Sequence, residues 1–101
     1  MSTLDLATAT AETFAPFIGQ VFEAVFSDGR LPLTLVEVKP LGASRKPDLR
    51  APFSLTFRGQ PSLRLPQRTY HLENASAGTM EIFLVQVGGG AEGSQFEAIF
   101  A

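Results

Sequence analysis

Residues 53–58 read Phe-Ser-Leu-Thr-Phe-Arg, a strict alternation of apolar and polar side chains. Successive side chains of a strand point to opposite faces of a sheet, so the alternation predicts a strand with Phe53, Leu55 and Phe57 facing a core. Such a strand, with one face in water, is typical of antiparallel sheets. The stretch therefore favours a mainly β fold.

Similar stretches recur along the chain, separated by glycine, proline, aspartate and serine. The Asp28-Gly29 pair suits a tight hairpin turn. The apolar face changes phase between Leu35 and Val36, which a β-bulge near Leu35 or burial on both faces would explain, and the bulge is the favoured interpretation. Six strands are predicted, at 20–26, 33–39, 53–58, 69–73, 79–87 and 95–100. They favour a small antiparallel six-stranded barrel, closed or nearly closed, with a compact two-sheet roll as the alternative.

The N-terminal part predicts one short amphipathic helix at about residues 8–15. Threonines at 8 and 10 are candidate N-caps, and Pro16 biases the preceding residue away from helical geometry. The helical segment is expected to end before Gly19, and the first strand follows it. Three apolar side chains are expected to plug one end of the core: Phe14, Phe17 and Ile18.

Length and composition limit the class of protein to which the chain can belong. The 101 residues, 45% of them hydrophobic and nine of them Phe, predict a single domain over residues 1–101. With no cysteine, a disulfide framework and thiolate chemistry are excluded. The sequence shows neither a signal peptide nor an apolar run of membrane-spanning length, so we expect synthesis in the cytoplasm and no membrane insertion, with the final compartment open.

Residues for catalysis are sparse, and the sequence predicts no enzyme, no cofactor and no metal site. The single histidine, His71, lies at an outward strand position beside Glu73; a hydrolytic site would need Ser54 or Ser76 as its nucleophile. The glycine-rich stretch 88–93 precedes a strand, whereas phosphate loops precede a helix. A surface histidine and a hairpin loop are the simpler interpretations.

Charge is divided unevenly along the chain. Residues 39–68 hold seven of the eight basic residues and one acid, a net charge of about +6, and the remainder carries about −8. This segment could bind phosphates, an acidic protein surface or the acidic part of an identical subunit, unless its side chains disperse around the barrel. Nucleic acid is the less favoured ligand because exposed aromatic residues are not interleaved with the basic ones. The candidate binding residues are Arg45, Lys46, Arg50, Arg58, Arg64 and Arg68.

Four ordered stretches resemble a bacterial family catalogued only as a domain of unknown function: 51–59 (APFSLTFRG), 65–72 (LPQRTYHL), 78–88 (GTMEIFLVQVG) and 96–100 (FEAIF). The resemblance spans nearly the whole chain. It implies an association with phage tail-collar proteins, and hence a structural or accessory role in a tail-like or fibre-like assembly. It assigns no catalytic residue. Gln67 and Tyr70 of its Pro-Gln-x-x-Tyr motif are expected to be fold residues, with the Tyr70 hydroxyl hydrogen-bonded at the barrel rim.

Three functions are ranked from these observations. The first is a non-catalytic structural or protein-interaction module that works as an oligomer or as part of a larger, exported assembly. The second is binding of an anionic ligand or nucleic acid through residues 39–68. A hydrolase that uses His71 is the third.

Overall fold

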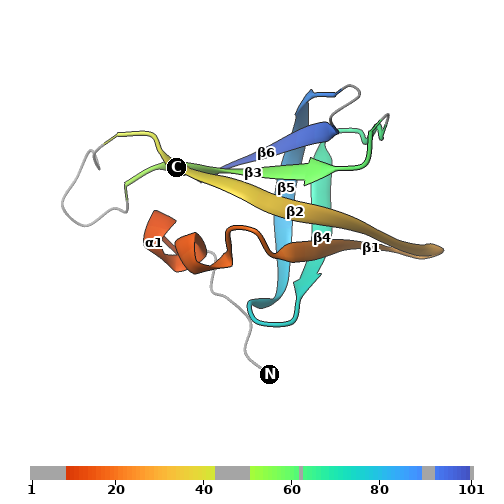
Figure 1. Cartoon of the computed structure of the whole chain (residues 1–101), viewed down its shortest axis with the longest axis horizontal. Helices are drawn as coiled ribbons and strands as arrows, with labels where there is room; N and C mark the ends of the chain where they lie inside the picture. The colour runs from red at the N-terminus through yellow and green to blue at the C-terminus, as the bar shows by residue number, and fades with distance from the viewer. Residues whose placement is uncertain (1–8, 43–50, 62, 90–92, 101) are drawn as a thin grey trace.

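The chain folds into a closed antiparallel barrel. The computed structural model describes residues 9–42, 51–61, 63–89 and 93–100. Within them a short helix precedes six strands, which follow the order β1-β2-β3-β6-β5-β4 around the barrel (Figure 1). The predicted mainly β fold is confirmed, and the closed barrel, rather than the two-sheet roll, is the architecture adopted.

The elements agree closely with the strands expected from the sequence. Their bounds are α1 Ala11–Phe14, the 3₁₀ turn η1 Ala15–Phe17, β1 Val21–Phe26, β2 Gly29–Pro40, β3 Phe53–Gly59, β4 Arg68–Asn74, β5 Gly78–Gly88 and β6 Ser94–Phe100. The predicted start of β2 at residue 33 was wrong. Phe26 pairs with Gly29, so Ser27 and Asp28 form the turn and Gly29 already belongs to the second strand.

The predicted bulge in β2 is confirmed. The register against β3 shifts between Leu35, which pairs with Phe57, and Glu37, which pairs with Thr56. The extra residue lets Leu35 and Val38 both face inward although three positions separate them. The change of apolar phase in the sequence therefore has a direct backbone cause.

The helix closes one end of the barrel through Phe14. Its ring centroid lies 5.9 Å from that of Phe53 and 5.8 Å from that of Phe100, and Phe14 is fully buried. Phe17 is half-buried, edge-on to Phe22. The expectation that Ile18 joins this plug was wrong: Ile18 is 48% exposed, because the chain turns away at Gly19, whose φ is +93°.

Residues 63–67 cover the opposite end of the barrel. Leu63 and Leu65 pack against the core, and the Gln86 side chain fixes them: its Oε1 accepts from Leu65 N at 3.1 Å and its Nε2 donates to Leu63 O at 2.9 Å. The Tyr70 hydroxyl donates to Pro66 O, as expected for a rim tyrosine, and Gln67 is exposed. Side chains from both barrel ends and from every strand thus fill the interior.

Candidate functional site

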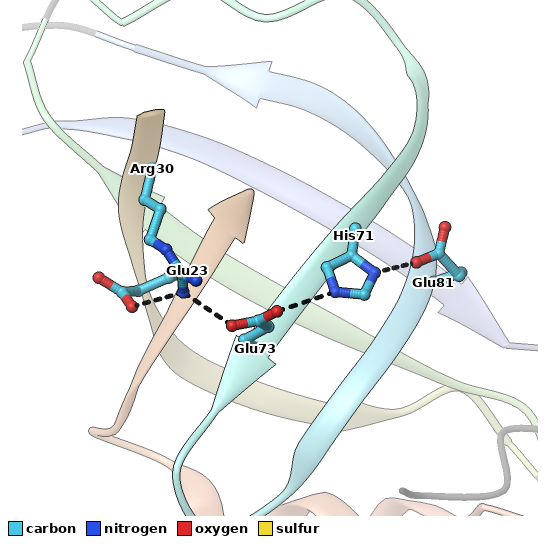
Figure 2. A network of polar contacts seen from close by, with 5 residues as sticks. All are labelled: Glu23, Arg30, His71, Glu73 and Glu81. Atoms are coloured by element: carbon cyan, nitrogen blue, oxygen red, sulfur yellow. Dashed lines mark hydrogen bonds and ion pairs between the residues drawn. The ribbon is translucent and has the colours of Figure 1, made fainter. Parts of the chain in front are cut away.

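A chain of five charged or titratable side chains crosses the outside of the barrel (Figure 2). Arg30 Nη1 lies 3.3 Å from Glu23 Oε1 and 2.7 Å from Glu73 Oε1. The other oxygen of Glu73 lies 3.1 Å from His71 Nε2, and His71 Nδ1 contacts Glu81. The network connects β2, β1, β4 and β5.

Strand register brings these residues together. Glu23 of β1 and Glu73 of β4 are Cα partners, as are His71 of β4 and Glu81 of β5. His71 and Glu73, two residues apart on one strand, share the outer face. The predicted outward position of His71 beside Glu73 is confirmed, whereas its contact with Glu81 depends on a pairing that the sequence alone does not reveal.

The network shifts the titration of three of its members. Hydrogen bonds from His71 to Glu81 and then to Glu73 raise the pKa of His71 above its ordinary value of 6.5. Hydrogen bonds from Arg30 and then from His71 lower the pKa of Glu73, and the bond to Glu73 raises the pKa of Arg30. The carboxylates on both sides of the ring therefore favour the protonated imidazole.

Within the described residues, the partners of His71 are carboxylates, and neither candidate nucleophile, Ser54 or Ser76, is in contact with it. Both of its ring nitrogens face carboxylate oxygens. Ser54 lies on β3, on the opposite side of the barrel from β4, and the backbone N of Ser76 donates to Asn74 Oδ1 within the turn after β4. Among the described residues, no group of three or more His, Asp or Glu side chains is arranged to hold a metal ion.

The predicted basic residues are only partly placed. Arg45, Lys46 and Arg50 lie outside the described residues. The other three are exposed near the barrel end that residues 63–67 cover: Arg58 is the next-to-last residue of β3, Arg64 lies within the covering segment, and Arg68 begins β4. Arg68 lies over the Tyr70 ring, with its Cζ 5.1 Å from the centroid.

The outer face of β5 is a candidate surface that was not predicted from the sequence. This strand is apolar on both faces: Ile82 and Leu84 point into the core, while Phe83, Val85 and Val87 point outward. Phe83 is 53% exposed and Val87 is 54% exposed. The uninterrupted run Ile-Phe-Leu-Val at 82–85 was the available signal, because a strand with one face in water is expected to alternate.

The fold and these surfaces define a small closed β-barrel with a helical plug and a filled interior. Residues 9–100 match the family model described as a domain of unknown function, DUF6916. The chain belongs to that family, which accounts for the likeness to a domain of unknown function. No curated protein and no solved structure matches it. Within the described residues, no helix is long and apolar enough to cross a membrane.

Proposed function

We propose that this barrel is a non-catalytic protein-interaction module, an accessory or subunit of a larger fibre-like or tail-like assembly. The observation that carries the proposal is the outer face of β5, where Phe83, Val85 and Val87 form an apolar stripe. Phe83 and Val87 stay more than half exposed. An antiparallel strand that is apolar on both faces is expected to be covered on both, and the core covers only the inner one.

The way the barrel is filled supports the same function. Large side chains, among them Phe22, Phe57 and Phe96, occupy the interior. Small barrels of this kind contain a packed core, so the outer surface is what they offer to partners. Ile99 of β6, 64% exposed, extends the apolar surface on the strand next to β5.

Photocrosslinking in the cells from which the chain comes tests this proposal. A photoreactive phenylalanine analogue replaces Phe83, and the matched control replaces Ile18, which is exposed to a similar degree on another part of the barrel. We expect discrete protein adducts, identified by mass spectrometry, from position 83 and a loss of those adducts when Val87→Ser and Ile99→Ser are added. Equal labelling from both positions, or none from position 83, contradicts the proposal.

A second candidate function is binding of an anionic ligand or nucleic acid through residues 39–68. It is favoured by the exposed Arg58, Arg64 and Arg68 near one barrel end. Binding to heparin and to single-stranded DNA would then fall steeply with salt, and charge reversal at Arg45 and Lys46 would weaken it further. Failure to bind either polyanion at low salt would remove this candidate.

A further inference from the structure

The hairpin of β1 and β2 extends beyond the other strands at its turn (Figure 1). Towards this turn, the pairing of β1 with β4 stops at Ala24, the partner of Leu72, and β2 pairs with β3 only from Thr34, the partner of Arg58. Among the described residues, those from 25 to 31 therefore pair only with each other and with Ala24, as a two-stranded ribbon. We call residues 25–31 the arm.

Burial decreases along the hairpin towards the turn. Phe22 and Leu33, which pair with each other farthest from the turn, are fully buried. Phe26 and Leu31 of the arm are half-buried, and residues 27–30 are exposed. A two-stranded hairpin without a third strand is marginally stable in water, so the arm depends on its contacts with the barrel.

Side chains of β4 hold the arm on both of its faces. On the inner face, the rings of Phe26 and Tyr70 form a T-shaped pair with their centroids 6.0 Å apart. On the outer face, Arg30 Nη1 lies 2.7 Å from Glu73 Oε1 in a solvent-exposed ion pair (Figure 2). Neither contact is part of a backbone ladder, so the arm can separate from β4 without breaking a strand pair.

The arm covers one side of the Tyr70 ring, which is only 3% exposed. The other contacts of this side chain come from the barrel: Arg68 lies over the ring, with its Cζ 5.1 Å from the centroid, and the hydroxyl donates to Pro66 O. When the arm separates, these contacts keep Tyr70 in place. One side of an aromatic ring then becomes accessible on an otherwise intact barrel.

We propose that the arm lifts from β4 as a unit while the rest of the barrel stays folded, and that this opening uncovers the Tyr70 ring. Local openings occur where few apolar side chains are buried and backbone hydrogen bonds are exposed to solvent, as they are in the arm. The opening involves a different part of the barrel from the β5 stripe and goes beyond the interaction function proposed above. It gives the protein a second apolar surface, present only in the open form and made by Tyr70, Phe26 and Leu31.

Native-state hydrogen exchange of the full chain in increasing urea tests the proposal. The amides of Phe26 and Leu31 report on the arm. Those of Leu55 and Phe57 report on the barrel, because β3 is paired on both sides at these positions. In the wild type, the arm amides should exchange through an opening that urea barely affects, since it exposes little surface, whereas the β3 amides should exchange only with global unfolding.

Two variants loosen the arm, each with a matched control. Phe26→Ala removes the aromatic contact, and its control is Phe17→Ala, because Phe17 is also half-buried and in a T-shaped pair, 6.3 Å from Phe22. Relative to the β3 amides, exchange of the arm amides should become about tenfold faster in Phe26→Ala, the upper end of what an aromatic pair contributes beyond its buried area. In Phe17→Ala the arm should not be singled out.

Arg30→Gln removes the outer contact at an exposed position, so the barrel should stay folded, and Arg64→Gln is its control. It should speed exchange of the arm amides by a smaller factor that shrinks as salt rises, as expected for an exposed ion pair. Circular dichroism of every variant checks that the barrel is folded.

Fluorescence quenching reports the uncovering itself, because Tyr70 is the only tyrosine and the chain has no tryptophan. Acrylamide should quench Tyr70 more strongly in Arg30→Gln than in the wild type or in Arg64→Gln. This variant decides the measurement because it leaves the Phe26 ring in place.

Two exchange results would overturn the proposal: arm amides whose opening has the same free energy and urea dependence as that of the β3 amides, or exchange in both loosening variants that is no faster than in their controls. Quenching in Arg30→Gln equal to that in Arg64→Gln would show that the opening does not uncover Tyr70.

Discussion

Glu23 on β1 and Glu73 on β4 lie directly opposite each other in the ladder that closes the barrel. Like charges in such a position destabilise a sheet. Arg30, reaching over from β2, lies between them, with its Nη1 3.3 Å from one carboxylate and 2.7 Å from the other (Figure 2). One guanidinium therefore links three strands where the first and fourth meet.

Replacing Arg30 by glutamine should lower Tm, because the two opposed carboxylates lose the cation between them. The effect should be small, as for other exposed ion pairs, and should shrink as salt rises, since the Debye length is only about 10 Å at 0.1 M. Adding Glu23→Gln to the Arg30→Gln variant should recover part of the loss. Thermal melts at low and high salt measure this, with Arg64→Gln as control; an unchanged Tm at low salt would show that Arg30 is dispensable.

The His71 imidazole should make stability depend on pH above 6.5, the ordinary pKa of a histidine. Its pKa is raised in the folded protein, so the folded state holds the proton more tightly than the unfolded one. The stabilisation is then complete below the ordinary value of 6.5 and is lost as pH rises through the higher folded pKa. Glu73 acts in the opposite range: its pKa is lowered, so its contribution is present above its ordinary value of 4.5 and is lost in acid.

His71 is the only histidine, so NMR titration of its ring reports this pKa without overlap. We expect a value above 6.5, and a value that returns towards 6.5 in the Glu81→Gln variant. The His71→Gln variant should lose the dependence of Tm on pH above 6.5, and it should still lose stability in acid as Glu73 becomes protonated. A titration at or below 6.5 in the wild type would contradict the pairing of His71 with both carboxylates.

Much of the fold was predictable because local patterns determine it. The alternation in 53–58 fixes the inward face of β3, with Phe53, Leu55 and Phe57 all fully buried. The change in the phase of the apolar positions after Leu35 marks the position of the bulge. These features depend on neighbouring residues of one strand, whose side-chain period is two, so a single sequence carries them.

The charged network and the uncovered stripe depend instead on which strands become neighbours. Arg30 and Glu73 are 43 residues apart and meet only because β1 pairs with β4 on closure. In the closed barrel the Phe83 side chain points outward, and no strand or helix of the described residues packs over it. The prediction that Ile18 is part of the plug was wrong for a local reason. Its spacing from Phe14 suits a helix, but the chain leaves helical geometry after Phe17.

The helical plug should depend on Phe14 far more than on Ile18. Phe14→Ala removes a fully buried ring packed against Phe53 and Phe100, a change that costs about 3–5 kcal/mol in other cores. Ile18→Ala should cost much less, because nearly half of Ile18 is in solvent. Urea unfolding of both variants gives the comparison, and similar losses would mean that Ile18 contributes to the plug after all.

Asn74 should be the residue on which closure between β1 and β4 depends most. It is nearly buried, and its Oδ1 accepts from the backbone N of Ser76 at 2.8 Å and of Ala77 at 2.7 Å. Its Nδ2 donates to Val21 O at 2.8 Å and to Gln20 Oε1 at 3.2 Å. One amide thus holds the β4–β5 turn with its oxygen and β1 with its nitrogen.

Two substitutions separate these roles. Asn74→Ala removes both sets of bonds and should cost about 2–4 kcal/mol, since a net bond contributes about 1 kcal/mol and unsatisfied buried groups cost more. Asn74→Asp keeps an acceptor for Ser76 and Ala77 but turns a second oxygen towards Val21 O, so it should weaken only the contact with β1. That variant should regain stability as pH falls, because a protonated carboxyl can donate to Val21 O.

Hydrogen exchange distinguishes the two outcomes at the level of single amides. In Asn74→Asp at neutral pH, the Ser76 and Ala77 amides should remain protected while amides of β1 exchange faster; in Asn74→Ala both groups should exchange faster. If the aspartate variant instead loses protection in the turn, or if its stability relative to the wild type does not rise in acid, then the Nδ2 contact with Val21 O does not hold the barrel closed. Closure would then rest on the backbone ladder and on Arg30 alone.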